Sequence, residues 1–190
     1  MRVGVLALQG DFAEHAQMLH KIGVEPVEVR KPEHLDGLAG LIIPGGESTA
    51  IGKLAGNSGL REPLQQFVQQ YPTWGTCAGA IFLAKNVEGQ APHLGVMDIS
   101  IQRNAFGRQL DSFAYPLTIQ GLEGGPYRAV FIRAPIITGV GPQVETLARL
   151  EDGRIVAARQ GNLLATSFHP ELTPDDRMHR YFVEMVERAG

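Results

Sequence analysis

Residues 73–79 read Thr73-Trp74-Gly75-Thr76-Cys77-Ala78-Gly79, and here a predicted strand over 73–76 runs directly into a predicted helix over 78–85. Glycines on both sides of a nucleophile at such a junction permit a tight, strained turn that lifts the side chain clear of the backbone. The start of a helix also favours a thiolate, through its free amides and its dipole. We therefore interpret Cys77 as a nucleophile. A buried, inert cysteine is the alternative, and the flanking glycines argue against it.

The residues before this turn alternate between short apolar runs and helix-like stretches. An amphipathic stripe with Asp11 as its N-cap and Gly23 as its stop predicts the first helix. Strands are predicted over 3–8, 27–30 and 38–43, with a further helix over 63–70. This alternation is typical of βαβ units. We therefore expect an α/β fold of three layers, in which a mostly parallel central sheet is flanked by helices.

The carboxyl-terminal half contains shorter apolar runs interrupted by glycine and proline. Three more strands, some antiparallel or at the edge of the sheet, are predicted over 130–132, 155–158 and 163–165. The chain closes with a helix for which Thr173 is the predicted N-cap and Pro174 the first helical residue. Because there is no internal repeat, low-complexity stretch or linker, we expect residues 1–190 to form a single domain.

The composition argues against several classes of protein. A formal net charge of −3 with no run of basic residues disfavours a nucleic-acid-binding surface. Cys77 is the only cysteine, so no intrachain disulfide can form and a reducing compartment is indicated. The apolar run over 3–8 is too short for a membrane span or a signal-peptide core. We therefore expect a soluble, cytoplasmic protein that binds neither membranes nor nucleic acid.

A cysteine nucleophile needs a general base, and one of the six histidines has a suitable neighbourhood. His169 lies in Ser167-Phe168-His169-Pro170-Glu171, after the last predicted strand. Pro170 favours an extended His169, and alternate residues of an extended chain point the same way. Glu171 is then able to hold one ring nitrogen of His169 while the other faces Cys77, as in a catalytic triad.

The other histidines carry no such signal. His15 and His20 lie in the first predicted helix, at a spacing that does not put both on one face for a metal. His34 and His93 are expected in exposed loops, and His179 lies in the last helix between charged residues. We assign none of them a catalytic role. Without paired cysteine or histidine ligands, the sequence predicts no metal site.

An acyl-transfer intermediate needs hydrogen-bond donors for its oxyanion. The backbone amide of Ala78, directly after the nucleophile, is one candidate. The segment Pro44-Gly45-Gly46-Glu47-Ser48 is the other, because it follows a predicted strand and its two glycines leave backbone amides unobstructed. An ordinary strand-to-helix turn is the alternative interpretation of this segment.

Segments spread over the chain form one recognisable pattern: Ala7-Leu8-Gln9-Gly10, Pro44-Gly45-Gly46-Glu47-Ser48-Thr49, Gly75-Thr76-Cys77-Ala78-Gly79, Arg103-Asn104-Ala105-Phe106-Gly107-Arg108-Gln109, Asp111-Ser112-Phe113, Phe131-Ile132-Arg133-Ala134-Pro135 and Ser167-Phe168-His169-Pro170-Glu171-Leu172. Together they resemble the class I, or triad-type, glutamine amidotransferases, whose architecture is flavodoxin-like. Within that class the chain is most similar to the glutaminase subunits of pyridoxal 5'-phosphate synthase, the PdxT/SNO family. The resemblance covers essentially the whole chain, and its most specific parts are the blocks 103–113 and 131–135.

The resemblance implies hydrolysis of L-glutamine to L-glutamate and ammonia. It implies that Cys77 attacks the side-chain amide, that His169 acts as base and then as acid, and that Glu171 orients the imidazole. Gly46 and Ala78 are implied as the oxyanion donors. The implied glutamine-binding set offers a carboxylate and two guanidinium groups, which suit the α-amino and α-carboxylate groups of the substrate: Gly46, Glu47, Ser48, Arg103, Ile132 and Arg133. The sequence does not show which arginine binds substrate and which forms a structural ion pair.

The resemblance also implies a partner and no cofactor. Ammonia would pass to a separate pyridoxal 5'-phosphate synthase subunit, on whose ring-shaped core many glutaminase subunits assemble, for vitamin B6 biosynthesis. Gln9 and Gly10 lie beside the expected oxyanion loop and are implied as a relay through which docking activates the glutaminase. We hypothesise that the Gly45–Gly46 peptide is misoriented in the free subunit.

Three alternatives are open at the level of the sequence. The first is the glutaminase subunit of another amidotransferase, such as imidazole glycerol phosphate synthase, which shares the triad but lacks the 103–113 block. The second is a non-hydrolytic α/β module with a redox-active cysteine, which need not carry His-Pro-Glu. The third is a cysteine peptidase, against which Glu47 and Arg133 favour a free amino acid as the substrate.

Overall fold

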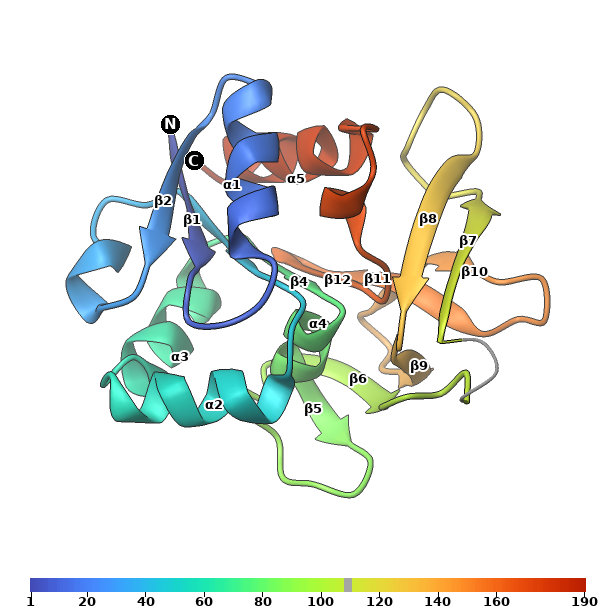
Figure 1. Cartoon of the computed structure of the whole chain (residues 1–190), viewed down its shortest axis with the longest axis horizontal. Helices are drawn as coiled ribbons and strands as arrows, with labels where there is room; N and C mark the ends of the chain where they lie inside the picture. Colours follow the sequence, from blue (N-terminus) through green and yellow to red (C-terminus); the bar gives the residue numbers. More distant parts are fainter. Residues whose placement is uncertain (108–110) are drawn as a thin grey trace.

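The computed structural model describes residues 1–107 and 111–190. It shows a curved sheet with helices on both of its faces (Figure 1). Residues 108–110 lie outside the described residues. They are part of the 103–113 block quoted above and include its Arg108 and Gln109. Within the described ranges, no helix is long and apolar enough to cross a lipid bilayer.

Four strands of the amino-terminal half and one late strand form the parallel part of the sheet. Their spatial order is β2 (Glu25–Val29), β1 (Arg2–Leu6), β3 (Gly40–Ile43), β4 (Thr73–Thr76) and β12 (Leu163–Thr166). Each strand runs parallel to its neighbour. This is the strand order of flavodoxin-like folds, in which sites form outside the carboxyl ends of the strands.

Beyond β12 the sheet is mostly antiparallel. It continues through β11 (Ile155–Gln160), β9 (Ile136–Val140) and β6 (Met97–Gln102) to β5 (Ala84–Val87), and β10 (Glu145–Arg149) also pairs with β11. Among the described residues, five of the nine pairings in this sheet are parallel and four are antiparallel. A separate hairpin of β7 (Ser112–Leu117) and β8 (Tyr127–Ile132) packs nearby. The antiparallel pairing predicted for the second half is therefore confirmed.

Helices cover the parallel part of the sheet on both faces (Figure 1). The helices α1 (Phe12–Lys21) and α5 (Arg177–Ala189) lie on one face. The helices α2 (Ser48–Asn57), α3 (Arg61–Gln70) and α4 (Ala78–Leu83) lie on the other. Two short 3-10 turns, η1 (Pro32–Leu35) and η3 (Pro170–Leu172), complete the helical elements described here.

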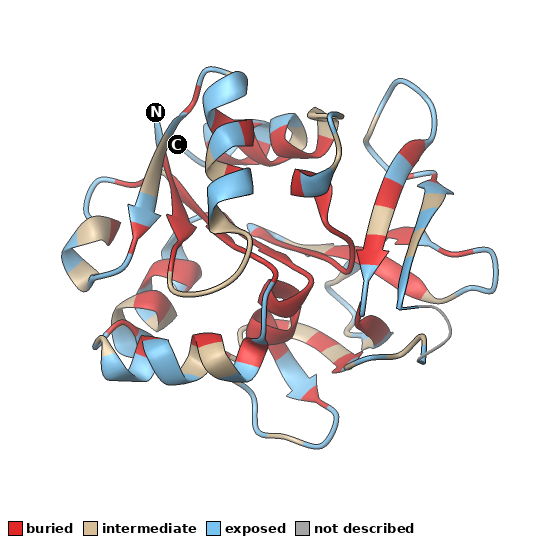
Figure 2. Cartoon of the chain, viewed as in Figure 1, coloured by how far each residue is buried: buried red, intermediate tan, exposed pale blue. Residues whose placement is uncertain are grey.

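The central strands are buried on both faces because successive side chains point into opposite layers. On β3, Ile42 belongs to the same apolar cluster as Trp74 and Phe182. Its neighbours Leu41 and Ile43 belong to the cluster on the opposite face. Figure 2 shows this burial running through the middle of the sheet. The predicted three-layer α/β fold is therefore confirmed.

Two helices on one side of the sheet differ from the prediction. The helix after Cys77 ends at Leu83, because Ala84 adopts an extended conformation and begins the edge strand β5. The helix α2 carried no clear signal in the sequence, since its apolar residues are interspersed with glycines. Its carboxylate N-cap is Glu47, whose side chain accepts hydrogen bonds from the first turn.

The start of the last helix was predicted wrongly. The helix begins at Arg177, and neither Thr173 nor Pro174 belongs to its first turn. The Thr173 hydroxyl instead accepts a hydrogen bond from the Asp175 N–H (3.2 Å), within the turn that precedes the helix. A short polar turn has thus displaced the helix start, because Thr and Asp side chains satisfy backbone amides in turns as well as at caps.

The glycines beside Cys77 allow α4 to pack directly on the sheet. A Cβ atom at Gly79 would overlap the carbonyl oxygen of Ile43, and one at Gly75 would overlap the backbone of Gly79. We predict that Gly79→Ala lowers the free energy of unfolding by about 1–3 kcal/mol, since backbone atoms must move to admit the methyl group. Urea denaturation followed by circular dichroism measures the change.

The matched control for this prediction is Gly56→Ala, at an exposed position in the last turn of α2 with no atom within 4 Å of the added Cβ. It should raise stability by roughly 0.4–1 kcal/mol, because alanine restricts the unfolded chain and favours the helix. Equal stabilities for wild type and Gly79→Ala would contradict the packing described for α4.

Candidate active site

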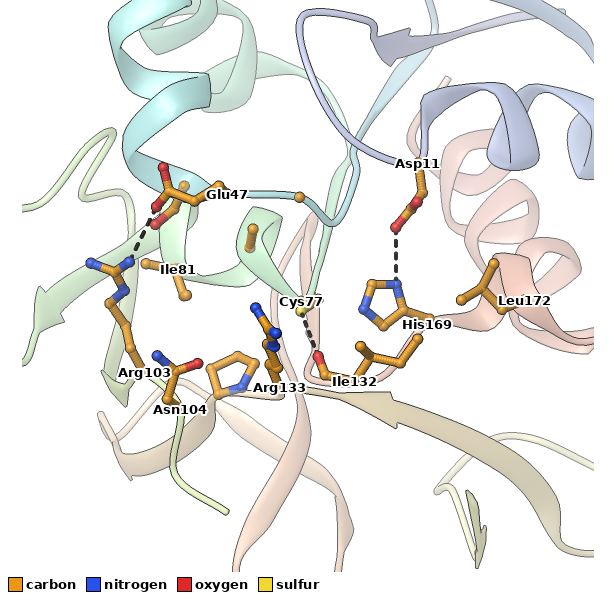
Figure 3. Close-up of a pocket in the computed structure, with 14 residues that line it drawn as sticks. Asp11, Glu47, Cys77, Ile81, Arg103, Asn104, Ile132, Arg133, His169 and Leu172 are labelled. Carbon is orange, nitrogen blue, oxygen red and sulfur yellow. Dashed lines mark hydrogen bonds and ion pairs between the residues drawn. The ribbon is translucent and has the colours of Figure 1, made fainter. Parts of the chain in front are cut away.

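The predicted site residues meet at the carboxyl ends of the parallel strands. The loops after β1, β3, β4 and β12 carry Gln9, Gly46, Cys77 and His169 respectively. A cavity of about 410 Å³ opens between these loops and the end of β8 (Figure 3). This position agrees with the general rule that ligands of such folds bind outside the carboxyl ends of the strands.

Cys77 occupies a strained turn between β4 and α4. Its φ angle is +51°, a left-handed conformation that is uncommon for a residue other than glycine. The turn is held in place by its backbone, since the Cys77 N–H donates to the Thr166 carbonyl of β12 at 2.8 Å. The Ala80 N–H in turn donates to the Cys77 carbonyl at 3.1 Å, which begins the helix. The predicted nucleophile turn is present, with the thiol facing the cavity (Figure 3).

His169 follows β12 and is held by a buried carboxylate. The backbone N–H of His169 donates to the Val130 carbonyl at 2.8 Å, which connects the loop to β8. Its Nδ1 atom lies 2.6 Å from Glu171 Oε1, the length of a strong charge-assisted hydrogen bond. The contact arises differently from the prediction: His169 has φ −102° and ψ 89°, outside the extended region, and Pro170 starts the 3-10 turn η3, which folds Glu171 back toward the ring.

The environment of His169 favours its protonated form. Burial by itself lowers the pKa of the ring. Hydrogen bonds to Asp11, Cys77 and Glu171, together with the charge of the Cys77 side chain, outweigh burial and raise the His169 pKa far above its ordinary value. Burial raises the pKa of the Glu171 carboxyl, and the hydrogen bond from His169 partly opposes that rise.

Asp11 is a member of the site that the sequence did not reveal. Its carboxylate lies 3.3 Å from His169 Nδ1, and its side chain lines the cavity (Figure 3). As predicted, it stands at the N-cap position of α1, but its side chain makes no capping hydrogen bond. In the sequence, the capping pattern already accounts for Asp11 and gives no signal of a second role. Only the tertiary contact with His169 exposes it.

His15 and His179 were also missed. Both side chains are completely buried, and His15 Nε2 lies 3.3 Å from Glu171 Oε2, on the side away from His169. The spacing of histidines along one helix could not have indicated this contact, because the two residues come from α1 and α5. The remaining histidines, His20, His34 and His93, make no contact with the predicted triad among the described residues.

The residues predicted to bind glutamine all line the cavity: Gly46, Glu47, Ser48, Arg103, Ile132 and Arg133. Glu47 and Arg103 form an ion pair at 3.2 Å, and Arg103 also donates to Gln90 Oε1 at 2.7 Å. The Glu47 carboxylate accepts hydrogen bonds from the amides of Thr49 and Ala50 as well, which lowers its pKa despite partial burial. Arg103 is thus engaged with protein groups.

Arg133 is placed differently from Arg103. It follows β8 with a φ angle of +45°, and its backbone N–H donates to the Asp111 carbonyl at 2.6 Å. Among the described residues its guanidinium group forms no ion pair, although it borders the cavity (Figure 3). The neighbouring Ile132 carbonyl lies 3.9 Å from Cys77 Sγ. Ile132 and Arg133 therefore line the part of the cavity in front of the Cys77 thiol.

Gln9 and Gly10 pack on the predicted oxyanion loop. The Gln9 side chain accepts a hydrogen bond from the Glu47 N–H at 2.7 Å. A Cβ atom at Gly10 would overlap the Gly45 carbonyl oxygen, and that oxygen accepts a hydrogen bond from the Asp11 N–H at 3.0 Å. The orientation of the Gly45–Gly46 peptide is thus coupled to the loop after β1.

Among the described residues, Asp11, His169 and Glu171 form the one group of His, Cys and carboxylate side chains close enough together to hold a metal ion. Their ligand atoms lie within 4.8 Å of one another. The 2.6 Å contact between His169 and Glu171 leaves no room for an ion between these two atoms, since zinc–ligand bonds are each about 2 Å long. We interpret the group as acid–base machinery.

A flavodoxin-like sheet with a cysteine on a glycine-flanked strand-to-helix turn, beside an imidazole held by a carboxylate, has the architecture of the class I glutamine amidotransferases. Residues 5–188 match the model of the SNO glutamine amidotransferase family. The chain belongs to this family, which confirms the resemblance seen in the sequence and disfavours the glutaminases of other amidotransferases.

Several relatives span nearly the full chain. A protein of Roseiflexus castenholzii, named pyridoxal 5'-phosphate synthase subunit PdxT, is 58% identical over 97% of this chain and 100% of its own length. A protein of Herpetosiphon aurantiacus with the same name is 60% identical over 96% of this chain and 99% of its own. A solved structure described as a glutamine amidotransferase superposes with a TM-score of 0.92, at 53% identity, over 97% of this chain and 98% of the other.

The contact between Asp11 and His169 generates a testable prediction. Because a nearby carboxylate favours the imidazolium form, Asp11→Asn should lower the pKa of His169 by on the order of one unit. Glu171→Gln should lower it further, since its contact is shorter and fully buried. Titration of the His169 ring resonances by NMR measures both changes. The control is Glu14→Gln, an exposed acid on the same helix, and an unchanged pKa in Asp11→Asn would contradict the role given to Asp11.

Proposed function

We propose that the chain is the glutaminase subunit of a pyridoxal 5'-phosphate synthase, as the names of its relatives indicate for those proteins. It hydrolyses L-glutamine to L-glutamate and supplies the ammonia to a separate synthase subunit. The observation that carries the proposal is that Cys77 and His169, from two different loops, border one cavity, while the buried Glu171 holds the His169 ring from behind. We also propose that residues 1–190 act as one glutaminase domain, since the cavity is bordered by loops from both halves of the chain.

The first half of the reaction forms a thioester. The Cys77 thiolate attacks the side-chain carbonyl carbon of glutamine, and the amide N–H groups of Ala78 and Gly46 stabilise the oxyanion. Protonated His169 then gives its proton to the amide nitrogen, which leaves as ammonia while the C–N bond breaks. Glu171 keeps the imidazole oriented and stabilises its charge, as the carboxylate of a triad does.

The second half of the reaction releases glutamate. Neutral His169 takes a proton from a water molecule, which attacks the thioester carbon. The tetrahedral intermediate collapses with loss of the Cys77 thiolate, and L-glutamate leaves. The proton taken from water restores the imidazolium, so the enzyme returns to its starting state without a cofactor.

The two arginines of the site differ in their ion pairs, and we therefore assign them different roles. Arg103 is engaged with Glu47 and Gln90, so we assign it to shaping the cavity and holding Glu47. Arg133 forms no ion pair among the described residues and is therefore available for the α-carboxylate of glutamine. Glu47, which borders the same cavity, suits the α-amino group. The buried Ser48 hydroxyl has no hydrogen-bond partner in the described part of the chain and is able to bind the substrate as well.

Activation by the partner is a second part of the proposal. The Gly45–Gly46 peptide is held by the Asp11 N–H, and Gln9 holds the next amide, at Glu47. We propose that docking of the synthase subunit moves the Gln9–Gly10 loop, and that this reorients the peptide so that the Gly46 amide meets the oxyanion. Leu172 and Ile132 are exposed apolar residues that line the cavity and are suited to contact with a protein partner.

The nucleophile is tested by replacing its sulfur. We predict that Cys77→Ala abolishes glutamate formation, by at least about 10³-fold, because no other group can form the thioester. A coupled glutamate assay, run with and without a pyridoxal 5'-phosphate synthase subunit, measures turnover. Wild type should hydrolyse glutamine faster in the complex than alone. Retained turnover in Cys77→Ala would refute the proposed reaction, and equal rates with and without the partner would refute the activation.

The substrate role of Arg133 is tested through KM. Arg133→Gln should raise the KM for glutamine by roughly 10–100-fold and change kcat little, because it removes a charge-assisted contact that the ground state and the transition state share. Arg133→Lys should fall between, since an ammonium lacks the planar fork. Arg128→Gln, at an exposed arginine of β8, the strand that precedes Arg133, is the control. A fall in kcat at unchanged KM would contradict the assignment.

A further inference from the structure

Two imidazoles lie behind the proposed triad and take no part in the reaction described above. His15 of α1 and His179 of α5 are completely buried, and His15 Nδ1 lies 2.9 Å from His179 Nε2. The other nitrogen of His15, Nε2, lies 3.3 Å from Glu171 Oε2. Polar contacts therefore run inward from His169 through Glu171 and His15 to His179, across three elements that are distant in the sequence.

The surroundings leave this pair few other interactions. His15 Nε2 lies 3.1 Å from the Thr76 hydroxyl of β4. The ring of Trp74 stands edge-on to both imidazoles, at centroid distances of 5.8 Å from His15 and 5.0 Å from His179. Among the described residues, His179 Nδ1 and Glu171 Oε2 form no aligned hydrogen bond. The titratable groups that face this pair are Glu171 and His169 on the side of His15, and Asp176, whose charge acts on His179.

Hydrogen-bonding capacity then assigns the protons. A carboxylate can only accept, and Oε1 of Glu171 already accepts from His169, so a donor is needed beside Oε2. His15 Nε2, at 3.3 Å from Oε2 and 3.1 Å from the Thr76 oxygen, is placed to supply this donor, and we therefore assign the ring proton to it. A neutral imidazole has only one N–H, so His15 Nδ1 accepts, and His179 Nε2 donates to it. The remaining nitrogen, His179 Nδ1, is then a bare acceptor, which agrees with its lack of a partner.

Burial supports neutral forms for both residues. It lowers the pKa of His15 well below its ordinary value, with the neighbouring His179 and His169 adding to the effect. It lowers the pKa of His179 to about 3. A second positive charge next to His169 is therefore disfavoured, and His15 acts toward Glu171 as a neutral donor.

We propose that His15 is a positioning residue that holds Glu171 ionised and turned toward His169, and that His179 fixes His15 in the tautomer that this requires. The inference rests on the proposed glutaminase reaction, in which Glu171 must support the imidazolium. Neither His15 nor His179 borders the cavity, so their effect on catalysis passes entirely through Glu171. Without the His15 donor, the buried Glu171 carboxylate has one hydrogen-bond partner fewer. Its neutral form then becomes more favourable, which means that the pKa of Glu171 rises.

The test compares two substitutions of similar volume at residue 15. His15→Met removes the donor, whereas His15→Gln places an amide N–H near the position of Nε2. His15→Met should lower kcat at least about 10-fold, with the KM for glutamine within twofold of wild type, and shift the acidic limb of the pH–rate profile to higher pH. His15→Gln should restore most of kcat and the original profile. His20→Met, at an exposed residue of the same helix, is the control.

Folding is checked separately by thermal unfolding and by the fluorescence of Trp74, the only tryptophan of the chain. If folded His15→Met keeps the kcat and pH profile of wild type, the proposal is wrong. It is also wrong if folded His15→Gln fails as badly as His15→Met, because the residue then acts through packing alone. A wild type that does not hydrolyse glutamine with its partner would refute the proposed function instead.

A second measurement needs no substitution. Nitrogen NMR of the wild-type imidazoles distinguishes a protonated from a bare ring nitrogen. Between pH 5 and 9, His15 should stay neutral with its proton on Nε2, and His179 should also carry its proton on Nε2. A His15 ring that is protonated on Nδ1 alone, or that titrates in this range, would overturn the proposal even if every variant at residue 15 failed to fold.

Discussion

The site depends on the close approach of α4 to the sheet. This approach exists because Gly75 and Gly79 have no side chains: the backbone of α4 meets the carbonyl of Ile43 and the backbone of β4 without intervening atoms. The same contact forces the connecting residue, Cys77, into a left-handed conformation. A residue keeps a strained backbone conformation only where the surrounding contacts hold it there. Here the hydrogen bond from the Cys77 N–H to the Thr166 carbonyl does so. The thiol is consequently fixed at the edge of a cavity.

Around this fixed nucleophile, the site is built from loops that meet because parallel strands end at the same edge. The loop after β1 supplies Asp11 and Gln9, the loop after β3 supplies the predicted oxyanion donor, and the loop after β12 supplies the imidazole. The separate hairpin of β7 and β8 contributes Arg133, which directly follows β8. The loops are also coupled to one another, because the Asp11 N–H and the Gln9 side chain both hold the segment after β3. A movement of one loop is therefore transmitted to the next.

Electrostatics in the interior follow from a carboxylate placed between imidazoles. A buried carboxylate on its own is costly, and Glu171 is tolerated because the His169 ring donates to Oε1 and, in our proposal, His15 donates toward Oε2. Asp11 adds a second, partly exposed negative group to the same ring nitrogen of His169. Together these groups favour the imidazolium form, which in the proposed reaction stabilises a thiolate and then delivers a proton to the leaving nitrogen.

The sequence by itself determined the layered α/β fold, the turn that carries Cys77, and the pairing of His169 with Glu171, because each depends on residues that are close along the chain. Strand and helix periods, flanking glycines and the His-Pro-Glu motif are local signals. Helix boundaries were less predictable: Thr173 carries a capping signal but forms a turn, and α2 lacks a clear apolar stripe. Only the tertiary structure revealed the contacts that underlie the roles proposed for Asp11, His15 and His179, and separated Arg103 from Arg133 by their ion pairs. Those contacts join elements that are distant in the sequence. In the sequence itself, Asp11 is explained by its helix-capping position, and His15 and His179 by their places within helices, so none of the three carries a signal of a further role.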